Sequence, residues 1–207
     1  TCILNIGGIS NITLINQPLG EKLVSKDIGP GNCLIDKWIR KNSEKKFDDN
    51  GRLASLGKNN EIILEQAQEL YSNRTIKNKR SFDVNDFDVS FARGLSLEDG
   101  ATTLTEFTAD ILSAALNDNI LKFNELISTI YLCGGGRKNK FLVERIQKKI
   151  KSLIKLRKID DFQIDGDFIE SQAFAFLAIR SYLKLPISFP GTTGCKKATL
   201  GGELIDN

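Results

Sequence analysis

Three glycine-bearing turns contain most of the residues in this chain that could carry out chemistry. The first places Gly7 and Gly8 directly after a short stretch with the apolar residues Ile3, Leu4 and Ile6. Adjacent glycines at the end of a strand let the backbone approach a ligand closely and can present N–H groups to phosphate oxygens. The same pair is also typical of a plain hairpin turn, so this turn alone leaves both interpretations open.

The second turn joins an acidic residue, Asp27, to Gly29 and Gly31 and ends at Asn32, just before a helical pattern. The N-terminus of a helix offers unpaired N–H donors and the positive end of the helix dipole, and both favour phosphate. A carboxylate at the end of the preceding strand could accept the proton of an attacking nucleophile during phosphoryl transfer. The alternative is an aspartate whose oxygens only accept hydrogen bonds from turn amides.

The third turn contains Gly134, Gly135 and Gly136 directly after an apolar stretch, followed by Asn139. These glycines would let an adenine or ribose lie against the backbone. The pattern is not a dinucleotide-binding fingerprint, because Asn139 stands where a third glycine is required. No segment has the spacing of a P-loop either.

The residue types that the chain lacks restrict its chemistry further. It contains no histidine, which excludes Ser-His-Asp and Cys-His catalysis and histidine-based metal sites within it. Its four cysteines form no CxxC pair, a pattern typical of a reducing compartment such as the cytoplasm. The acidic stretch 48–51 lacks EF-hand spacing and predicts a turn. We therefore expect carboxylates, backbone amides, lysine and arginine to act, without a recognisable set of metal ligands.

Charge and hydropathy argue against two classes of partner. The net charge is only +3, from 29 basic and 26 acidic residues, and gives no electrostatic case for binding nucleic acid. The longest apolar run, residues 173–179, is far shorter than the roughly 20 residues of a membrane-spanning helix. We therefore expect neither a nucleic acid nor a membrane as a partner.

The order of apolar patterns predicts an α/β fold with a mixed sheet covered by helices. Residues 2–28 predict a meander of three antiparallel strands with a turn at residues 17–20. A short buried strand is expected at residues 129–133. Helical spacing predicts helices near 34–39, 62–71, 104–116, 139–153 and 167–183, and weak periodicity predicts a long loop or insertion at 73–100.

Several details of these elements are also predicted. Asn32 is placed to cap the first helix, and Thr103 and Glu106 are spaced like a capping box. Trp38 is expected in the core. The basic stretch 148–158 contains apolar residues at helical spacing and predicts a solvated helix face.

Taken in order along the chain, the motifs resemble the anhydro-N-acetylmuramic acid kinase family of the actin/hexokinase/Hsp70 ATPase superfamily. The segments that carry the resemblance are LNIGGISN (4–11), DIGPGN (27–32), ATTLTEFTA (101–109), CGGG (133–136) and, after Glu170, AFAFLA (173–178). The sequence departs from the family where a Pro-Pro-Lys-Ser segment is usual, since residues 78–81 read NKRS. This departure puts the rigidity of that loop, and any role of its basic residue, in doubt.

The resemblance implies an actin/hexokinase/Hsp70-like (ribonuclease H-like) fold, incomplete at the N-terminus. The chain opens at Thr1 on an apparent strand and has no counterpart of the family's first phosphate loop. We therefore expect residues 1–207 to form the C-terminal ATPase-like domain of a two-domain sugar kinase whose N-terminal domain is missing. We also expect this chain alone to be inactive, because one wall of the cleft would be absent.

The resemblance also implies a reaction and a set of site residues. ATP and water would convert 1,6-anhydro-N-acetylmuramic acid, a small-molecule sugar, to N-acetylmuramic acid 6-phosphate during peptidoglycan recycling in the cytoplasm. Mg²⁺ is expected from the chemistry of phosphoryl transfer. Asp27 would be the general base, and Glu170 would face the sugar. The residues bordering ATP would be Gly7, Gly8, Gly29, Gly31 and Asn32 near the phosphates, and Gly134, Gly135, Gly136 and Asn139 near the nucleoside.

Alternatives to this reading remain. Another sugar or acid kinase of the same fold would use a different acceptor, and substrate profiling would separate it. A non-catalytic nucleotide-binding domain would bind ATP without phosphoryl transfer. The oligomeric state is left open by the sequence, with a homodimer among the options.

Overall fold

The computed structural model describes residues 1–15, 23–73, 81–123, 126–203 and 205. Its centre is a five-stranded sheet with the strand order β3-β2-β1-β4-β5. The strands are β1 (Cys2–Ile6), β2 (Ile9–Ile15), β3 (Leu23–Pro30), β4 (Thr129–Cys133) and β5 (Lys155–Lys158). The first three pair antiparallel, whereas β4 runs parallel to both β1 and β5. The predicted meander and mixed sheet are confirmed.

The central position of β1 follows from its composition. Alternate residues of this strand are fully buried, and Leu4 lies opposite Ile12 of β2 on one side and Leu132 of β4 on the other. Apolar cross-strand neighbours of this kind stabilise a sheet beyond its backbone hydrogen bonds. The two glycine turns that follow β1 and β4 therefore emerge from neighbouring parallel strands at the same edge of the sheet.

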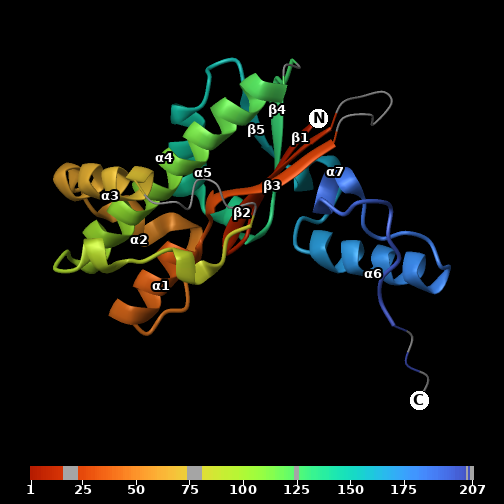
Figure 1. The fold of residues 1–207 in the computed structure, drawn as a ribbon. Coiled ribbons are helices and arrows are strands. Elements are labelled where there is room, and N and C mark those ends of the chain that lie inside the picture. The colour runs from red at the N-terminus through yellow and green to blue at the C-terminus, as the bar shows by residue number, and fades with distance from the viewer. Residues whose placement is uncertain (16–22, 74–80, 124–125, 204, 206–207) are drawn as a thin grey trace.

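Helices lie on both sides of the sheet (Figure 1). One side carries α1 (Cys33–Asn42), α2 (Arg52–Leu56), α3 (Glu61–Asn73), α4 (Leu97–Phe123) and α5 (Lys140–Lys149), and the other carries α6 (Ile169–Tyr182) and α7 (Pro190–Thr193). The long helix α4 packs on β2, β3 and the neighbouring helices, with Leu104, Leu112 and Leu116 fully buried. The predicted α/β class with covering helices is confirmed.

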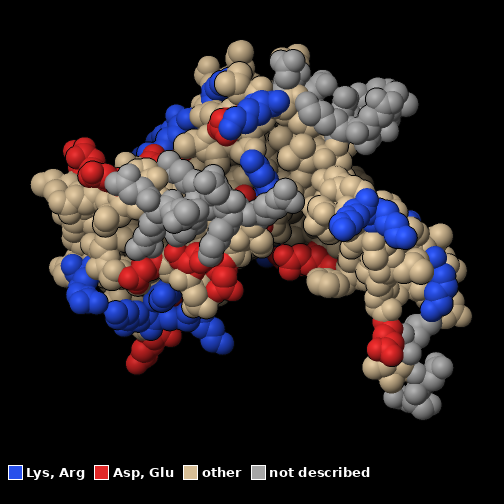
Figure 2. Space-filling model, viewed as in Figure 1, with Lys and Arg blue, Asp and Glu red and all other residues tan. Residues whose placement is uncertain are grey.

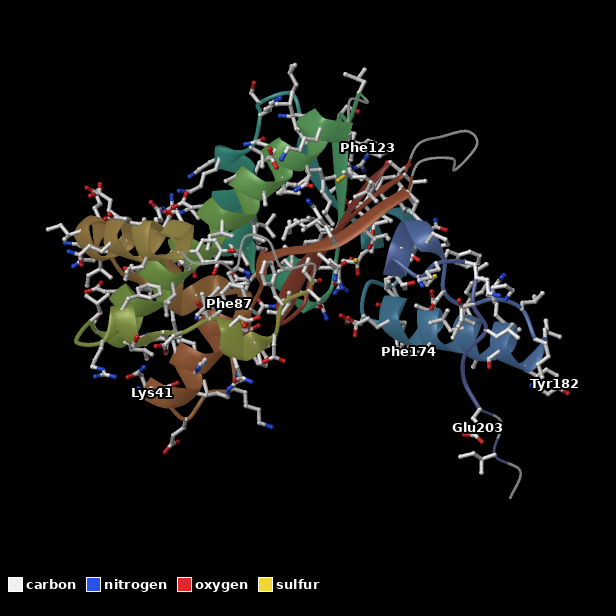
Figure 3. All side chains as sticks on the ribbon, viewed as in Figure 1. Lys41, Phe87, Phe123, Phe174, Tyr182 and Glu203 are labelled. Atoms are coloured by element: carbon white, nitrogen blue, oxygen red, sulfur yellow. The ribbon has the colours of Figure 1, made fainter. Side chains whose placement is uncertain are left out.

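Helix α6, like the short α7 and unlike the helices on the other side of the sheet, has no buried residue. Its apolar residues are distributed around the helix, and Phe174 remains 73% exposed. Figure 3 shows Phe87 among the helices on one side of the sheet, whereas Phe174 and Tyr182 stand on α6 on the other side. A helix that is apolar on all sides is usually buried, so α6 departs from the ordinary relation between composition and exposure.

Two predicted helix caps are wrong. Asn32 precedes α1 but makes no capping side-chain hydrogen bond. Thr103 and Glu106 lie inside α4, which begins at Leu97, so they form no capping box. Thr103 instead accepts a hydrogen bond from the amide of Asn60 through its hydroxyl oxygen, because the packing of the α3 entry against α4 supplies that donor.

The basic stretch 148–158 is not one helix face. Helix α5 ends at Lys149, and the chain turns before entering β5, which pairs with β4. The turn is fixed by the burial of Ile150 and Ile154, whereas Leu153 is 85% exposed. The helical prediction was wrong here because these two isoleucines anchor a turn and a strand at the edge of the sheet.

Other local predictions are confirmed. Asp48 accepts hydrogen bonds from the amides of Leu53 and Ala54, so the acidic stretch forms a turn into α2. Trp38 is buried and donates its indole N–H to the carbonyl of Leu97.

The predicted turn at 17–20 and residues 78–80 lie outside the described residues. The described residues 81–96 form short 3-10 turns and loop, as predicted, although α4 has already begun by residue 100. No helix in the described ranges combines the length and apolar character needed to cross a membrane.

Asp36, in the first turn of α1, is a source of pH-dependent stability. Burial raises the pKa of its carboxyl to about 6, with Arg40 opposing the shift and Asp48 adding to it. A folded-state pKa above the unfolded one means that this group favours folding below about pH 4 and loses that contribution as the pH rises through about 6.

We therefore predict that Asp36→Asn raises the free energy of unfolding at pH 8 by about 1 kcal/mol, after allowance for solvent screening, and leaves it nearly unchanged at pH 4. Urea unfolding followed by circular dichroism at pH 4, 6 and 8 measures the effect. Asp161→Asn, at an exposed carboxylate, is the control and should change little. Equal effects of Asp36→Asn at pH 4 and pH 8 would contradict the prediction.

Candidate functional site

The first two glycine turns are joined by backbone hydrogen bonds. The carbonyl of Gly8 accepts from the amides of Gly31 (2.9 Å) and Cys33 (3.1 Å), and the carbonyl of Gly7 accepts from the amide of Asn32 (2.8 Å). A Cβ atom at Gly31 would overlap the carbonyl of Gly7. These amides are thus committed to the protein, so the entry to α1 positions the first turn and does not present these three N–H groups to a ligand.

The third turn packs directly on the end of β1. Gly134 has φ 77°, and a Cβ atom there would overlap Asn5 Oδ1 and lie 2.7 Å from the carbonyl oxygen of Ile6. A Cβ atom at Gly136 would overlap the Ile6 side chain. Glycine is therefore required at both positions, by backbone conformation at the first and by close packing at both.

A cavity of about 240 Å³ opens where the first and third turns meet the start of α6. Its lining residues are Asn5, Gly7, Gly8, Gly134, Gly135, Gly166, Asp167, Ile169 and Glu170. We refer to it as the glycine cavity. Figure 2 shows acidic side chains bordering the indentation between the part of the molecule that carries α6 and the rest.

The glycine cavity brings together five of the residues that the sequence singled out: Gly7, Gly8, Gly134, Gly135 and Glu170. It also contains Asn5 and Asp167, which sequence reasoning missed. A signal for Asn5 was present, because it is a polar residue inside an otherwise apolar strand that leads into Gly7. Asp167 could have been noticed as an acid just before an apolar helix.

Four other predicted residues lie behind this lining. Gly29 and Gly31 pack against α4 and the first turn, respectively. Gly136 is buried on Ile6. Asn139 is 6% exposed, and its Oδ1 accepts from the amide of Leu142, which makes it the N-cap of α5. None of these four residues is among those that line the cavity.

Asp27 lies in β3 and borders a different, larger hollow of about 670 Å³, whose lining includes Tyr71, Phe82, Asp110 and Asp118. The Oδ2 atom of Asp27 accepts hydrogen bonds from the Ser81 hydroxyl (3.1 Å) and the Phe82 amide (2.8 Å). Both bonds fix the orientation of the carboxylate. Among the described residues, Asp27 and Glu170 therefore face separate hollows.

Asp167, just before α6, places an ionised carboxylate in the lining of the glycine cavity. Hydrogen bonds from Arg137 and then from Lys138 lower the pKa of the Asp167 carboxyl, so it is ionised at neutral pH. Burial raises the pKa of the Cys133 thiol at the end of β4, with Glu170 adding to the shift and Arg137 opposing it. A thiol with a raised pKa is a poor nucleophile, which leaves carboxylates and backbone groups as the reactive chemistry.

Nothing in the described part of the chain groups three or more Cys, Asp or Glu residues as a metal site would. The free cysteines Cys2, Cys33 and Cys133 are buried. The polar groups that line the glycine cavity are backbone atoms, the amide side chain of Asn5 and the carboxylates of Asp167 and Glu170.

The overlap at Gly134 gives a prediction with an internal control. Gly134→Ala would place an L-residue at positive φ and also force its Cβ onto Asn5, whereas Gly94 has φ 92° and open space around it. We expect Gly94→Ala to lower the free energy of unfolding by about 1–2 kcal/mol. Gly134→Ala should lower it by about 1–3 kcal/mol more, because overpacking adds to the backbone strain. Urea unfolding measures both variants, and equal losses would show that the contact with Asn5 is unimportant.

Comparison with known proteins places this chain among relatives of one kind. The family model described as anhydro-N-acetylmuramic acid kinase matches residues 1–206. The anhydro-N-acetylmuramic acid kinase of Pelagibacter ubique (strain HTCC1062) is 51% identical over 206 residues, which cover 100% of this chain and 55% of that protein. The enzyme of the same name from Zymomonas mobilis subsp. mobilis (strain ATCC 31821 / ZM4 / CP4) is 36% identical over 204 residues, covering 98% and 53%.

The chain thus spans about half the length of these relatives. Among solved structures, gluconate kinase from Lactobacillus acidophilus matches with a TM-score of 0.49 and 16% identity, over 76% of this chain and 34% of that one.

Proposed function

The chain belongs to the anhydro-N-acetylmuramic acid kinase family, and on that premise we propose that the full-length protein phosphorylates 1,6-anhydro-N-acetylmuramic acid with ATP and water. The product would be N-acetylmuramic acid 6-phosphate, and the reaction would serve peptidoglycan recycling in the cytoplasm. The observation that carries the proposal is the family match over residues 1–206, together with the glycine cavity that the family's own motifs line.

We assign the nucleotide to the glycine cavity. Gly7, Gly8, Gly134 and Gly135 leave its floor without side chains, so a phosphate chain or ribose can approach the backbone. The fit to ATP is supported by the ends of the parallel strands β1 and β4, because ligands bind at the carboxyl ends of strands in α/β sheets. Mg²⁺, when bound with ATP, would neutralise charge on the β- and γ-phosphates.

Glu170 is assigned to the sugar. It lines the glycine cavity and is exposed, so its carboxylate is free to accept a hydrogen bond from a sugar hydroxyl. Asp167, at the same wall, is already held by Arg137 and Lys138. Glu170 is therefore suited to binding a ligand, whereas Asp167 is suited to holding the protein's own structure.

Asp27 is assigned the role of general base. Water would attack the anomeric carbon and lose a proton to Asp27, and the bond from that carbon to the bridging 6-oxygen would break. The 6-oxygen would take the γ-phosphoryl group of ATP as the bond from the γ-phosphorus to the β,γ-bridging oxygen breaks and ADP leaves. The hydrogen bonds from Ser81 and Phe82 both end on Oδ2 and so orient the carboxylate for such a step. Because Asp27 and Glu170 border separate hollows here, the role requires that the two be brought to one substrate in the full-length protein.

We further propose that residues 1–207 form one domain of a two-domain kinase. The support is the coverage of about half the relatives' length and the single continuous core around the sheet. ATP would then lie against this domain, and the sugar between the two.

The activity is tested on the full-length protein with ATP, Mg²⁺ and 1,6-anhydro-N-acetylmuramic acid, with the 6-phosphate product detected by mass spectrometry. We predict product formation, and a decrease in kcat of about 10²- to 10⁴-fold in Asp27→Asn, because general-base catalysis contributes about that much. Asp118→Asn is the matched control, since Asp118 borders the same hollow but pairs with Lys122 at the surface.

Three results would contradict these assignments. Turnover of another sugar in place of the anhydro sugar would overturn the substrate. Full activity of Asp27→Asn would overturn the assignment of Asp27 as general base. Equal loss of activity in Asp27→Asn and Asp118→Asn would show that activity depends only on the negative charge around this hollow.

We predict that the 207-residue chain alone gives no product under the same conditions. About half of the relatives' length is not represented in it, and the carboxylates of the proposed reaction face separate hollows. The same mass-spectrometric assay, run at equal molar concentration beside the full-length protein, measures this. Turnover by the 207-residue chain at a rate comparable to the full-length protein would contradict it.

A further inference from the structure

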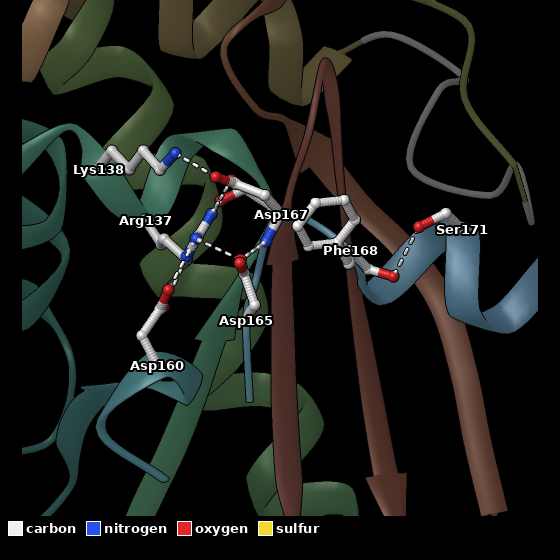
Figure 4. Close-up of polar contacts among 8 residues, drawn as sticks. Arg137, Lys138, Asp160, Asp165, Asp167, Phe168 and Ser171 are labelled. Carbon is white, nitrogen blue, oxygen red and sulfur yellow. Dashed lines mark hydrogen bonds and ion pairs between the residues drawn. The ribbon is translucent and has the colours of Figure 1, made fainter. Parts of the chain in front are cut away.

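Arg137, in the short 3-10 helix Gly135–Lys138 that follows the third glycine turn, is only 2% exposed. Its guanidinium donates two hydrogen bonds to the Asp160 carboxylate in a bidentate pair, from Nε to Oδ2 (2.7 Å) and from Nη2 to Oδ1 (2.8 Å). Nη1 donates to Asp167 Oδ1 (2.8 Å) and to the carbonyl of Gly134 (3.0 Å). Figure 4 shows this cluster, in which one buried cation joins the glycine turn to two carboxylates further along the chain.

The backbone around the cluster fits the guanidinium closely. Gly166 is buried, and a Cβ atom at this position would overlap Arg137 Nε. Asp165 adds a carboxylate oxygen 4.0 Å from Nη2. The segment 160–167 therefore wraps around Arg137, and its glycine leaves room for the guanidinium plane.

This segment leads directly into α6. Asp167 precedes Glu170 by three residues, and both line the glycine cavity. Helix α6 itself has no buried residue that could fix its position by packing. Phe162 of this segment contacts Tyr131 of β4, at 5.0 Å between ring centroids, and the guanidinium of Arg157 lies 4.7 Å from the centre of the Phe162 ring. The start of α6 is consequently held to the sheet mainly through polar contacts that converge on Arg137.

From this geometry we propose that Arg137 is a positioning residue, which holds residues 160–167 against the third glycine turn and thereby fixes Glu170 across the cavity from Gly7 and Gly8. The inference rests on the proposed function only for the role of Glu170 toward the sugar. Arginine suits this task because its planar fork binds a carboxylate bidentately and still has donors for a second carboxylate and a carbonyl. A lysine ammonium at the same place would satisfy fewer of these acceptors.

The ionisation of the two carboxylates agrees with a lasting attachment of residues 160–167 to Arg137. Hydrogen bonds from Arg137 are the first cause of the lowered pKa of both the Asp160 and the Asp167 carboxyl. Both carboxylates therefore stay ionised across the neutral range, and their pairing with Arg137 persists there. A buried guanidinium that lost these partners would be an uncompensated charge, which proteins tolerate poorly.

The test uses the full-length protein with Arg137→Gln and Arg137→Lys, and with Arg93→Gln as the control. Arg93 is an exposed arginine in the loop just before α4 and lies outside the segment 160–167, so its replacement removes one positive charge without touching that segment's sequence. Amide hydrogen exchange is measured at residues 166–172 and at β1, and steady-state kinetics are measured for the sugar and for ATP.

We expect Arg137→Gln to accelerate exchange at residues 166–172 by about tenfold or more, because several charge-assisted hydrogen bonds are lost, while β1 stays unchanged. Arg137→Lys should give an intermediate effect. KM for the sugar should rise by about tenfold with a much smaller change in KM for ATP, since Glu170 is displaced and the glycine floor is not. Arg93→Gln should alter neither measurement.

Three outcomes would contradict the proposal. Unchanged exchange at residues 166–172, or exchange accelerated equally in β1, would show that Arg137 does not hold this segment specifically. Locally accelerated exchange with unaltered kinetics of an active kinase would show that it does not position Glu170. If the unmodified protein phosphorylates no sugar, the proposed function fails separately, and the exchange result still decides whether Arg137 holds this segment. If Arg137→Gln does not fold, Asp160→Asn, at a partly exposed partner, is measured in its place with the same criteria.

Discussion

The backbone hydrogen bonds accepted by the carbonyl groups of Gly7 and Gly8 fix the start of α1 against the turn between β1 and β2. These carbonyl groups accept from the amides that begin this helix, so the end of β3 is tied to the same turn. Gly31 allows the approach because it carries no Cβ atom where the carbonyl of Gly7 lies. The third glycine turn then packs on the end of β1 that this bonding has fixed. The floor of the cavity therefore depends on backbone hydrogen bonds at its first turn and on close packing against Asn5 and Ile6 at its third.

Two buried charge clusters extend this scaffold in opposite directions. On the helical side, Glu106 of α4 is 7% exposed and lies between Arg145 and Lys149 of α5, with Arg145 Nε 2.7 Å from Glu106 Oε1 in ion-pair geometry. On the other side, Arg137 gathers the carboxylates that precede α6. Buried charges of this kind add little net stability, but they leave few alternative arrangements once paired. The cluster around Arg137 matters more for placement, because α6 has no buried residue, whereas α5 also packs through the fully buried Leu142 and Ile146.

The sequence was most informative where short-range rules decide the structure. Alternation of apolar residues predicted β1 and β2, and glycines after a strand predicted the turns, because both depend on a few neighbouring residues. The caps assigned to Asn32 and to Thr103 with Glu106 were wrong, since donors from elsewhere in the fold or a longer helix decided the outcome.

Strand β5 and the membership of the cavity required tertiary information. The basic stretch 148–158 has helical spacing, but pairing with β4 and the burial of Ile150 and Ile154 outweigh it. Asn5 and Asp167 come from distant parts of the chain, and only the adjacency of β1 to β4 and the wrapping of residues 160–167 bring them together. The separation of Asp27 from Glu170 likewise could not follow from their order in the sequence.

The packing of Trp38 gives this protein a convenient optical property. It is the sole tryptophan in the sequence, it is 4% exposed, and its indole donates to the carbonyl of Leu97, 59 residues away. Gly100 lies against the ring so closely that a Cβ atom there would overlap it. Intrinsic fluorescence therefore reports on a single long-range contact between α1 and α4, and its emission should move to longer wavelength when these two helices separate. The assembly of the helical layer can be followed in this way without any label.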